Sequence, residues 1–308
     1  MNELKKTYAD WVAVDWGTSN FRYWVIRSGE VICSGSKPLG IINLDQNSYE
    51  RILIQELDFF LHPSRVTIIL ICGMAGSRQG WKEAPYISVP CRPPEFCDAI
   101  SVKCMDARIL VKILPGLEQN TPPDVMRGEE TQIKGILTKH TNFDGVICLP
   151  GTHTKWVKIS AGEIISFQTF MTGELFSLLG ERSVLKHSIS KDGWEEKTFK
   201  DSVDQIMSDN KLFASMLFRL RGKSILKNLP KVEARSCLSG YLIGLELSGS
   251  RPYWMGETVL IVGEHKISLA YEQGLTTQGV IVQRDSYNDA SLQGLKEIYN
   301  SKKETSFF

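Results

Sequence analysis

The sequence lacks a hydrophobic segment long enough to cross a membrane. Its longest apolar run, Val66–Cys72, is far shorter than the roughly 20 residues that a spanning helix needs. The first residues carry charge and are not followed by the apolar stretch of a signal peptide. These two absences predict a cytoplasmic protein with no membrane partner.

Paired cysteines and a strong net charge are also missing. The 7 cysteines are an odd number, and none of them has the C-x-x-C or Cys/His spacing of a metal site. Apolar neighbours, as around Cys72 and Cys148, are typical of reduced thiols in the core of a cytosolic protein. The formal net charge of +1 provides no general attraction to nucleic acid, so no nucleic-acid partner is expected.

The glycine fingerprint G-x-G-x-x-G is absent near Asp15, which disfavours a nicotinamide-dependent dehydrogenase. Segments 11–32 and 145–165 instead share a pattern: an apolar strand, a Gly-Thr turn, an alternating strand with a tryptophan, and a third strand after Gly-Glu. Their turns begin at Gly17 and Gly151, close to half the chain apart. We interpret the pair as an internal duplication, although hairpins share turn chemistry and can arise independently.

Each of these segments is followed by alternating helices and strands. The hydrophobic pattern predicts helices at 47–61, 173–185, 233–247, 266–273 and 289–299, and buried strands at 66–71, 259–262 and 279–282. Residues 186–231 show no recognisable motif. This order predicts an α/β protein with an actin-like (ribonuclease H-like), duplicated two-domain fold that has mixed sheets and a central cleft. We expect the domains to be 1–135 and 136–308.

Both Gly-Thr turns carry groups suited to binding phosphate. Asp15 ends a strand before a glycine turn, whose backbone N–H groups can form an anion nest while the carboxylate holds Mg²⁺ through water. The second turn repeats this arrangement, although a lone histidine such as His153 more often stabilises a turn. Two such turns facing a cleft can grip the triphosphate of ATP. The expected phosphate-binding residues are Gly17, Thr18, Ser19, Gly151, Thr152 and His153.

Two further segments combine charged residues with glycine. Residues 124–132 contain Arg127, which can bind a phosphate or a substrate carboxylate, and a pair of glutamates, one of which can accept a proton. Acids at a helix start are also ordinary capping residues. Residues 73–86 mix glycine with aromatic and charged residues after a buried strand, which favours substrate contact. The expected substrate residues are Asn20, Arg22, Ser77, Arg78, Trp81 and Glu83.

Taken together, these motifs are similar to those of the 2-dehydro-3-deoxygalactonokinases. The similarity spans about residues 11–180, with a weaker continuation at 239–244, and its motifs are Asp15–Asn20, Gly73–Tyr86, Val125–Gln132, Pro150–Val157 and Phe170–Leu175. The resemblance implies membership of the actin/hexokinase/Hsp70 superfamily. It also implies transfer of phosphate from MgATP to the 6-hydroxyl of 2-dehydro-3-deoxy-D-galactonate, a step of galactonate catabolism.

The same resemblance implies roles for individual residues. Asp15 would hold Mg²⁺ or its water, and a catalytic glutamate would lie shortly before the second turn. Glu129 and Glu130 both satisfy that position; we favour Glu130 slightly, and the sequence does not separate them. Gly263 would lie in the adenosine region, but it is followed by Glu264 and a histidine instead of small residues. Such side chains can crowd the nucleotide or point to solvent.

Other functions stay open at this point. They are a binding protein of the same fold that has lost turnover, a kinase for a related 2-keto-3-deoxy sugar acid, and an ATPase. The polar and aromatic loop around Trp81 disfavours an ATPase, because water as the acceptor needs no such pocket. A homodimer is also compatible with the sequence. The preferred epimer of the acid depends on hydrogen-bond geometry that the sequence does not display.

Overall fold

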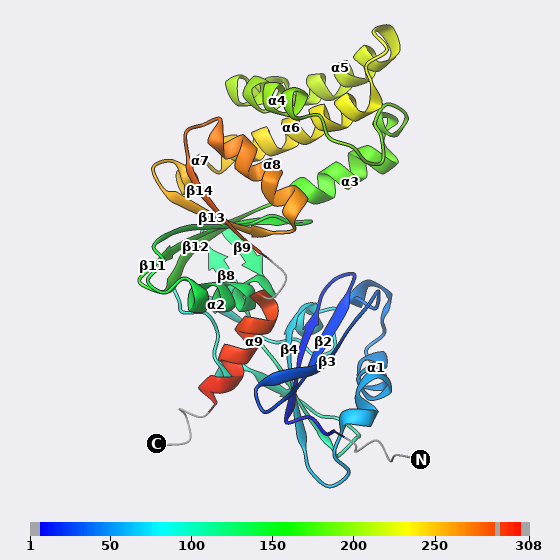
Figure 1. Ribbon diagram of the computed structural model, residues 1–308, viewed down its shortest axis with the longest axis vertical. Helices are drawn as coiled ribbons and strands as arrows, with labels where there is room; N and C mark the ends of the chain where they lie inside the picture. The colour runs from blue at the N-terminus through cyan, green and yellow to red at the C-terminus, as the bar shows by residue number, and fades with distance from the viewer. Residues whose placement is uncertain (1–6, 287–289, 303–308) are drawn as a thin grey trace. The chain divides into compact units, whose positions relative to one another are not determined.

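The computed structural model describes residues 7–286 and 290–302, which form two compact units (Figure 1). Unit 1 contains the described residues of Met1–Phe143, Gly162–Ile164 and Asn288–Phe308, and unit 2 contains those of Asp144–Ala161 and Ile165–Tyr287. Every helix in the described part of the chain is too short or too polar to cross a membrane.

Unit 1 is built on two sheets and three α-helices. Its strands are β1 (Trp11–Trp16), β2 (Phe21–Arg27), β3 (Glu30–Lys37), β4 (Thr67–Gly73), β5 (Tyr86–Ser88), β6 (Ile100–Val102), β7 (Ile109–Ile113), β8 (Gly116–Asn120) and β9 (Pro123–Met126). Its helices are α1 (Ser48–Leu57), α2 (Glu129–Lys139) and α9 (Ala290–Ser301). The larger sheet is mixed and has the order β3-β2-β1-β4-β7-β6, and the smaller has the order β5-β8-β9.

Helices cover both faces of the larger sheet, which explains why β1 is buried along its whole length. On one face, Val12 and Val14 pack with buried residues of α1. On the other face, Ala13 packs with buried residues of α9. Because successive side chains of a strand point to opposite faces, Asp15 lies on the face that α9 covers. The sheet therefore brings the first predicted site residue against the C-terminal helix.

Unit 2 repeats this arrangement. Its strands are β10 (Gly145–Leu149), β11 (Thr154–Ser160), β12 (Glu163–Phe170), β13 (Thr258–Gly263) and β14 (Ile281–Ser286). They form one mixed sheet with the order β12-β11-β10-β13-β14. β10 runs antiparallel to β11 and parallel to β13, as β1 does to β2 and β4. The order matches β3-β2-β1-β4-β7 of unit 1, as an internal duplication predicts.

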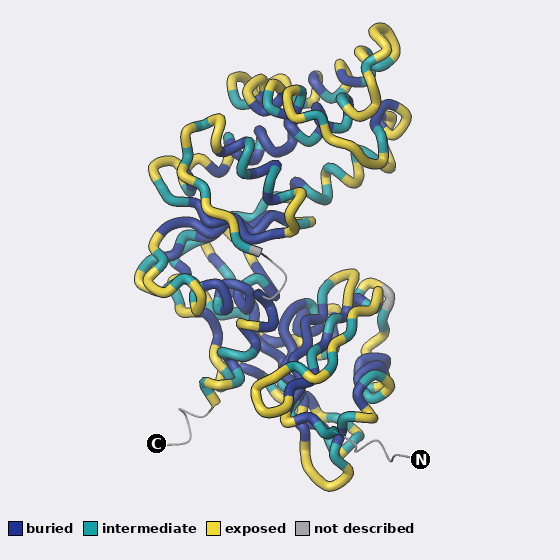
Figure 2. The backbone as a smooth tube through the Cα atoms, in the orientation of Figure 1, coloured by how far each residue is buried: buried dark blue, intermediate teal, exposed yellow. Residues whose placement is uncertain are grey.

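A helical layer packs on the sheet of unit 2. Its helices are α3 (Thr172–Arg182), α4 (Glu196–Ser208), α5 (Phe213–Leu226), α6 (Lys231–Gly249), α7 (Arg251–Trp254) and α8 (His265–Thr276). The small residues Gly240 and Gly244 let α6 lie directly against α4. Helices α4 and α5 occupy the stretch in which the sequence shows no motif. Many residues of α5 are exposed, whereas the central strands β10, β11 and β13 are mostly buried (Figure 2).

Each helix and strand expected from the hydrophobic pattern has a counterpart, with ends shifted by a few residues. The largest helix difference is at 47–61, where α1 ends at Leu57 and a short 3₁₀ helix, Asp58–Phe60, follows. The compact units also differ from the expected domains, because the first unit extends to Phe143 and α9 returns to it. Leu295 of α9 is buried against the sheet of unit 1, a contact that the order of elements along the chain does not reveal.

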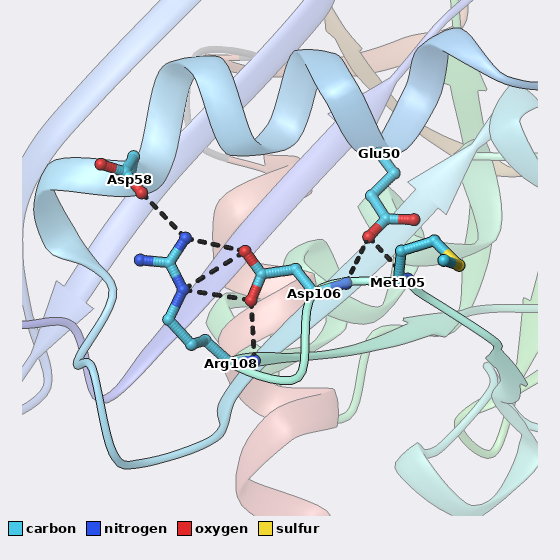
Figure 3. A network of polar contacts seen from close by, with 5 residues as sticks. All are labelled: Glu50, Asp58, Met105, Asp106 and Arg108. Carbon is cyan, nitrogen blue, oxygen red and sulfur yellow. Dashed lines mark hydrogen bonds and ion pairs between the residues drawn. The ribbon is translucent and has the colours of Figure 1, made fainter.

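A polar network fixes α1 to the segment before β7 (Figure 3). Arg108 contacts Asp58 at 2.8 Å and Asp106 at 2.7 Å, and this guanidinium lowers the pKa of Asp106. At the other end of α1, one oxygen of Glu50 accepts the backbone N–H groups of Met105 and Asp106, each at 2.8 Å. The helix is therefore held at both ends without using any predicted site residue.

Candidate active site

Asp15 is held in place by neighbours from two elements of unit 1. The residue is 7% exposed and lies opposite Arg22 in the β1–β2 pair. Its Oδ2 forms an ion pair with Arg22 Nη2 at 2.6 Å and accepts a hydrogen bond from Ser291 Oγ of α9 at 2.8 Å. The strand partner and the C-terminal helix thus fix the carboxylate, and Ser291 is a residue that sequence reasoning missed.

The first Gly-Thr turn presents its hydroxyls to solvent. It is closed by a hydrogen bond from the Gly17 N–H to the Asn20 carbonyl at 2.8 Å, and Thr18 and Ser19 are exposed. Gly40 supports the turn from below: its N–H donates to the Ser19 carbonyl at 3.0 Å, and a Cβ at Gly40 would collide with the Thr18 backbone. The turn is braced by the backbone while its side chains remain accessible.

Two glycines bring the ends of β1 and β4 together with the start of α2. Gly73 ends β4 with a φ of +87°, and a Cβ there would lie 2.8 Å from the Trp16 carbonyl oxygen and 3.4 Å from Asp15 Oδ1. A Cβ at Gly128 would lie 3.3 Å from the Gly73 Cα. Neither position has room for a side chain, so the backbone packs closely here. This close packing brings the Asp15 carboxylate near the first turn of α2.

Glu130 stands in this first turn of α2 and is fully buried. Burial, and then the charge of Glu129, raise its pKa to about 7. Its carboxylate accepts the Gly128 N–H at 2.6 Å and the Thr131 hydroxyl at 3.0 Å, and these bonds oppose the shift. A carboxyl group with this pKa can take up or release a proton near neutral pH.

Cys72 lies where the charges of both carboxylates reach it. The thiol is buried opposite Asp15 in the β1–β4 pair. Its pKa is raised well above the usual value by burial, and after that by the charges of Asp15 and Glu130. Both carboxylates are therefore near enough to act on one thiol. The structure thus brings together the residue expected to hold the metal and the favoured candidate for the general base.

Glu129 has a different environment from Glu130. Its side chain is partly exposed, and its Oε2 accepts the backbone N–H of Arg127 at 3.1 Å. This bond closes the loop that leads into α2. The two glutamates, adjacent in sequence, therefore differ in burial and in hydrogen-bond partners.

Arg127 is buried against the segment expected to contact substrate. It is 8% exposed; Nη2 donates to the Ala84 carbonyl at 2.8 Å, and the guanidinium carbon lies 4.3 Å from the centre of the Tyr86 ring. Its Nε and Nη1 have no hydrogen-bond partner among the described residues, and neither has the buried Ser77 hydroxyl. Polar atoms left unpaired in a protein interior commonly mark a ligand or water site.

The other residues expected to contact substrate differ in how far they are buried. Trp81 is half-buried and stacks on Tyr49 of α1, with ring centres 5.6 Å apart. Arg78 and Glu83 are exposed, and within the described part of the chain neither makes a hydrogen bond or an ion pair. The structure therefore brings Arg127 and Ser77 into the interior of unit 1 and leaves Arg78 and Glu83 at its surface.

In unit 2, the second Gly-Thr turn lies against the start of α3. The Glu174 N–H donates to the Thr152 carbonyl at 2.9 Å, and a Cβ at Gly173 would lie 2.9 Å from the Thr152 Cα. His153 Nε2 contacts Glu174 Oε2 at 2.6 Å, with both side chains partly exposed. This contact fits the reading of His153 as a residue that stabilises the turn.

Gly263 ends β13 beside the same turn. A Cβ at this position would lie 2.9 Å from Ser268 Oγ and 3.2 Å from Pro150 Cδ. The sequence left open whether the following charged residues crowd a nucleotide or point to solvent. Glu264 and His265 are both exposed.

A buried carboxylate that sequence reasoning missed lies on α6. Glu246 accepts the indole N–H of Trp156 at 2.7 Å, the Tyr271 hydroxyl at 2.7 Å, and the Thr172 hydroxyl. Tyr271 also bonds the hydroxyl of Thr154, the residue after the second turn, at 2.8 Å. The only feature of the sequence that could have indicated this residue is that it is a single acid within the apolar stretch of α6.

The repeated strand order and the glycine turns define the class of protein: an α/β fold of the actin-like type, as the sequence predicts. A crystal structure from Sinorhizobium meliloti, assigned to the 2-dehydro-3-deoxygalactonokinases, has a TM-score of 0.86 and 35% identity, and covers 94% of this chain and 96% of that chain. The activator of 2-hydroxyisocaproyl-CoA dehydratase from Clostridium difficile, solved with ADPNP, shares the fold at a TM-score of 0.50 and 10% identity, over 97% of both chains.

Residues 15–298 match the family model for 2-keto-3-deoxy-galactonokinase. The chain belongs to this family, which confirms the resemblance seen in the motifs. A protein of Rhizobium meliloti (strain 1021), named "Probable 2-dehydro-3-deoxygalactonokinase DgoK1", is 36% identical over 92% of this chain and 95% of its own length. The 2-dehydro-3-deoxygalactonokinase of Escherichia coli (strain K12) is 29% identical over 94% of this chain and 97% of its own length.

Proposed function

We propose that this protein transfers the γ-phosphate of ATP to the 6-hydroxyl of 2-dehydro-3-deoxy-D-galactonate. Membership of the kinase family and the names of both curated relatives support the reaction and the acceptor. One observation carries the chemistry: a buried glutamate with a pKa of about 7 lies near a second carboxylate where β1, β4 and α2 meet. A phosphoryl acceptor needs a proton acceptor of this kind at neutral pH.

In this proposal Glu130 accepts the proton of the attacking hydroxyl. Its raised pKa lets it hold that proton after transfer. The N–H of Gly128 and the hydroxyl of Thr131 keep its oxygens oriented. Glu129 is the second candidate for this role, but it is partly exposed and its Oε2 already accepts the Arg127 N–H.

The glycine turns bind the phosphates of ATP. In unit 1 the backbone at Gly17 and the exposed hydroxyls of Thr18 and Ser19 offer donors. In unit 2 the corresponding donors are Gly151, Thr152 and His153, and Gly263 gives the adenosine a surface without a side chain. The exposure of Glu264 supports nucleotide binding, because its charge is at the solvent. Asn20, Arg22 and Trp81 are proposed to contact the sugar acid.

Mg²⁺ fits the residues around Asp15. The ion prefers oxygen ligands, keeps several waters and is commonly held by one or two carboxylates together with substrate phosphates. Asp15 offers such a carboxylate near the exposed turn, and no group of three acidic, histidine or cysteine side chains suited to a metal occurs among the described residues. The bound ion would neutralise charge on the phosphates. Asp15 is kept in position for it by Arg22 and Ser291.

We also propose that the protein acts in the cytoplasm and can form a homodimer, with the sugar acid and ATP as its small-molecule partners. The family assignment supports the first statement. Light scattering of the purified protein at several concentrations tests the second, and a mass equal to one chain at all of them would contradict it.

A coupled ADP-release assay tests the function. The acceptors are 2-dehydro-3-deoxy-D-galactonate, its gluconate epimer, a neutral hexose and no sugar. We expect release that depends on the galactonate derivative and on Mg²⁺. Higher kcat/KM with the epimer would assign the enzyme to a related sugar acid. Thermal stabilisation by ATP and the acid without ADP release would instead identify a binding protein that has lost turnover, and equal release without sugar would identify an ATPase.

A further inference from the structure

Arg127 differs from the other basic residues near the expected substrate segment. Arg22 already forms an ion pair with Asp15, Arg78 is exposed, and the exposed Lys82 donates to the Ser101 carbonyl at 2.8 Å. Arg127 alone in this group is more than nine-tenths buried. No carboxylate of the described residues forms an ion pair with it.

The groups that the guanidinium contacts are neutral. A carbonyl oxygen, that of Ala84, takes one N–H, and the face of the Tyr86 ring lies against the plane. Both contacts stabilise a cation, but neither supplies a negative charge. Nε and Nη1 are buried and have no acceptor among the described residues. A buried charge without a counter-ion is costly, so this arrangement favours the arrival of an anion.

Ser77 provides a second unpaired polar group in the same place. A Cβ at Gly76 would lie 2.8 Å from Arg127 Nη1, so the guanidinium packs directly against this glycine. Ser77 is the next residue, is 5% exposed, and its hydroxyl has no partner among the described residues. A guanidinium fork with a neighbouring hydroxyl suits the two oxygens of a carboxylate.

We propose that Arg127 and Ser77 bind the C1 carboxylate of the sugar acid and make the enzyme select acids over neutral sugars. This inference rests on the proposed function and deepens it. Arg127 is followed by Gly128, whose N–H donates to the Glu130 carboxylate, so the group that binds the substrate carboxylate and the group that accepts the proton lie on one short segment. Because Nε and Nη1 are covered, the segment around Gly76 must shift to admit the acid.

The test compares 2-dehydro-3-deoxy-D-galactonate with its C1 amide, which keeps the hydroxyls and loses the charge. The variants are Arg127→Met, Arg127→Lys and Ser77→Ala, and the exposed Arg92→Gln is the control. For Arg127→Met we expect kcat/KM with the acid to fall by about 30-fold or more, as on breaking a buried charge pair. With the amide it should change by less than about 3-fold, while KM for ATP stays within about 2-fold of the wild type, since only the carboxylate contact is lost.

Ser77→Ala should lower kcat/KM for the acid by roughly 3- to 10-fold, as expected for one hydrogen bond, and Arg127→Lys should lie between the two. If Arg127→Met is destabilised and melts at a lower temperature, these milder variants still test the proposal. An equal loss with acid and amide would overturn the proposal and make Arg127 a residue of the fold. A selective rise of KM for ATP would assign the guanidinium to a phosphate instead.

Calorimetric titration of the acid without nucleotide separates this inference from the proposed function. Acid binding that is lost in Arg127→Met but kept in Arg92→Gln supports the carboxylate site even where the wild type releases no ADP. Undiminished binding in Arg127→Met would overturn the carboxylate site even where the wild type is an active kinase.

Discussion

Unit 1 and unit 2 repeat one strand order, but the equivalent strands end in different residues. β1 carries Asp15 two positions before Gly17, whereas β10 carries Leu149 two positions before Gly151. Both turns keep a glycine, a threonine and access to solvent. Both units therefore keep the turn that we propose to bind phosphate, while the carboxylate that we propose to hold the metal is present at this position only in unit 1.

The two buried glutamates extend this comparison. Burial raises the pKa of Glu130 in unit 1 and of Glu246 in unit 2 to about 7. Glu246 accepts hydrogen bonds from β11, α3 and α8, so both of its oxygens have partners. Glu130 has two donors and a neighbouring carboxylate. Similar pKa values thus arise at Glu246 and at the proposed base, Glu130, and the hydrogen-bond partners distinguish the two residues.

The largest effect is expected for Asp15→Ala. The change removes the carboxylate proposed to hold Mg²⁺ and its ion pair with Arg22, so ADP release should fall below detection. Ser291→Ala is the matched control, because it removes one hydrogen bond to the same carboxylate and should cost roughly 3- to 10-fold. Measurable turnover in Asp15→Ala at saturating Mg²⁺ would contradict the role of Asp15.

Glu130→Gln should lower kcat by about 10²- to 10⁴-fold, the usual contribution of a general base, with ATP affinity nearly unchanged. Because the base acts when deprotonated, the wild-type kcat should rise with pH through about 7. The variant should lack this limb of the profile. Stopped-assay rates between pH 5.5 and 9 and calorimetric titration of ATP check both points.

Glu129→Gln provides the matched control for this prediction. The side chain is partly exposed and adjacent in sequence, so its loss should reduce kcat by less than about 10-fold, below the range of a lost base. A larger loss in Glu129→Gln than in Glu130→Gln would reverse the assignment. Wild-type rates in both variants would exclude either glutamate as the base.

Glu246→Gln should affect stability more than catalysis. The amide nitrogen of glutamine would face donors that now meet a carboxylate, and leaving buried donors unpaired costs about 1–3 kcal/mol. In the wild type, the raised pKa of Glu246 means that the folded state binds more protons than the unfolded state between about 4.5 and 7. Stability therefore falls as pH rises across this window, and the variant should show a smaller fall.

Urea unfolding of the wild type and of Glu246→Gln at pH 5 and at pH 8 measures both quantities. Glu130→Gln is the comparison: it should lose activity while its unfolding midpoint changes less. A loss of kcat in Glu246→Gln as large as in Glu130→Gln, with unchanged stability, would show that the two glutamates are not divided between structure and chemistry.

Local patterns predicted much of this molecule. Alternating and continuous apolar runs predicted strands that the structure contains, because this periodicity follows from which side chains are buried on a sheet. The Gly-Thr turns were found for a similar reason: glycine and hydroxyl residues directly after a strand favour a turn. Both are properties of a few neighbouring residues. The duplicated strand order then followed from the repetition of the pattern and is confirmed by the structure.

Contacts between distant parts of the chain were not predictable in this way. Ser291 bonds Asp15 across 276 positions, and no local pattern marks it. Helix α4 was missed because most of its residues are polar, and α5 because its apolar residues do not follow burial: only Met216 and Leu220 of this helix are buried. The different environments of Glu129 and Glu130 also depend on tertiary packing, since a helix start alone gives both residues the same local setting.

The smallest effect is expected at the glycines that end β13 in unit 2 and β4 in unit 1, which are equivalent strands. Gly263→Ala places a Cβ 2.9 Å from Ser268 Oγ, a side chain that can rotate, so KM for ATP should rise only about 2- to 5-fold and stability should change little.

Gly73→Ala is the counterpart in unit 1; its φ of +87° and the Trp16 carbonyl oxygen 2.8 Å away should destabilise it by about 1–3 kcal/mol. Gly29→Ala has a similar φ of +82° but open space, so it isolates the backbone strain. If Gly263→Ala lowers the thermal stability more than Gly73→Ala, the closer packing and backbone strain at Gly73 would be contradicted.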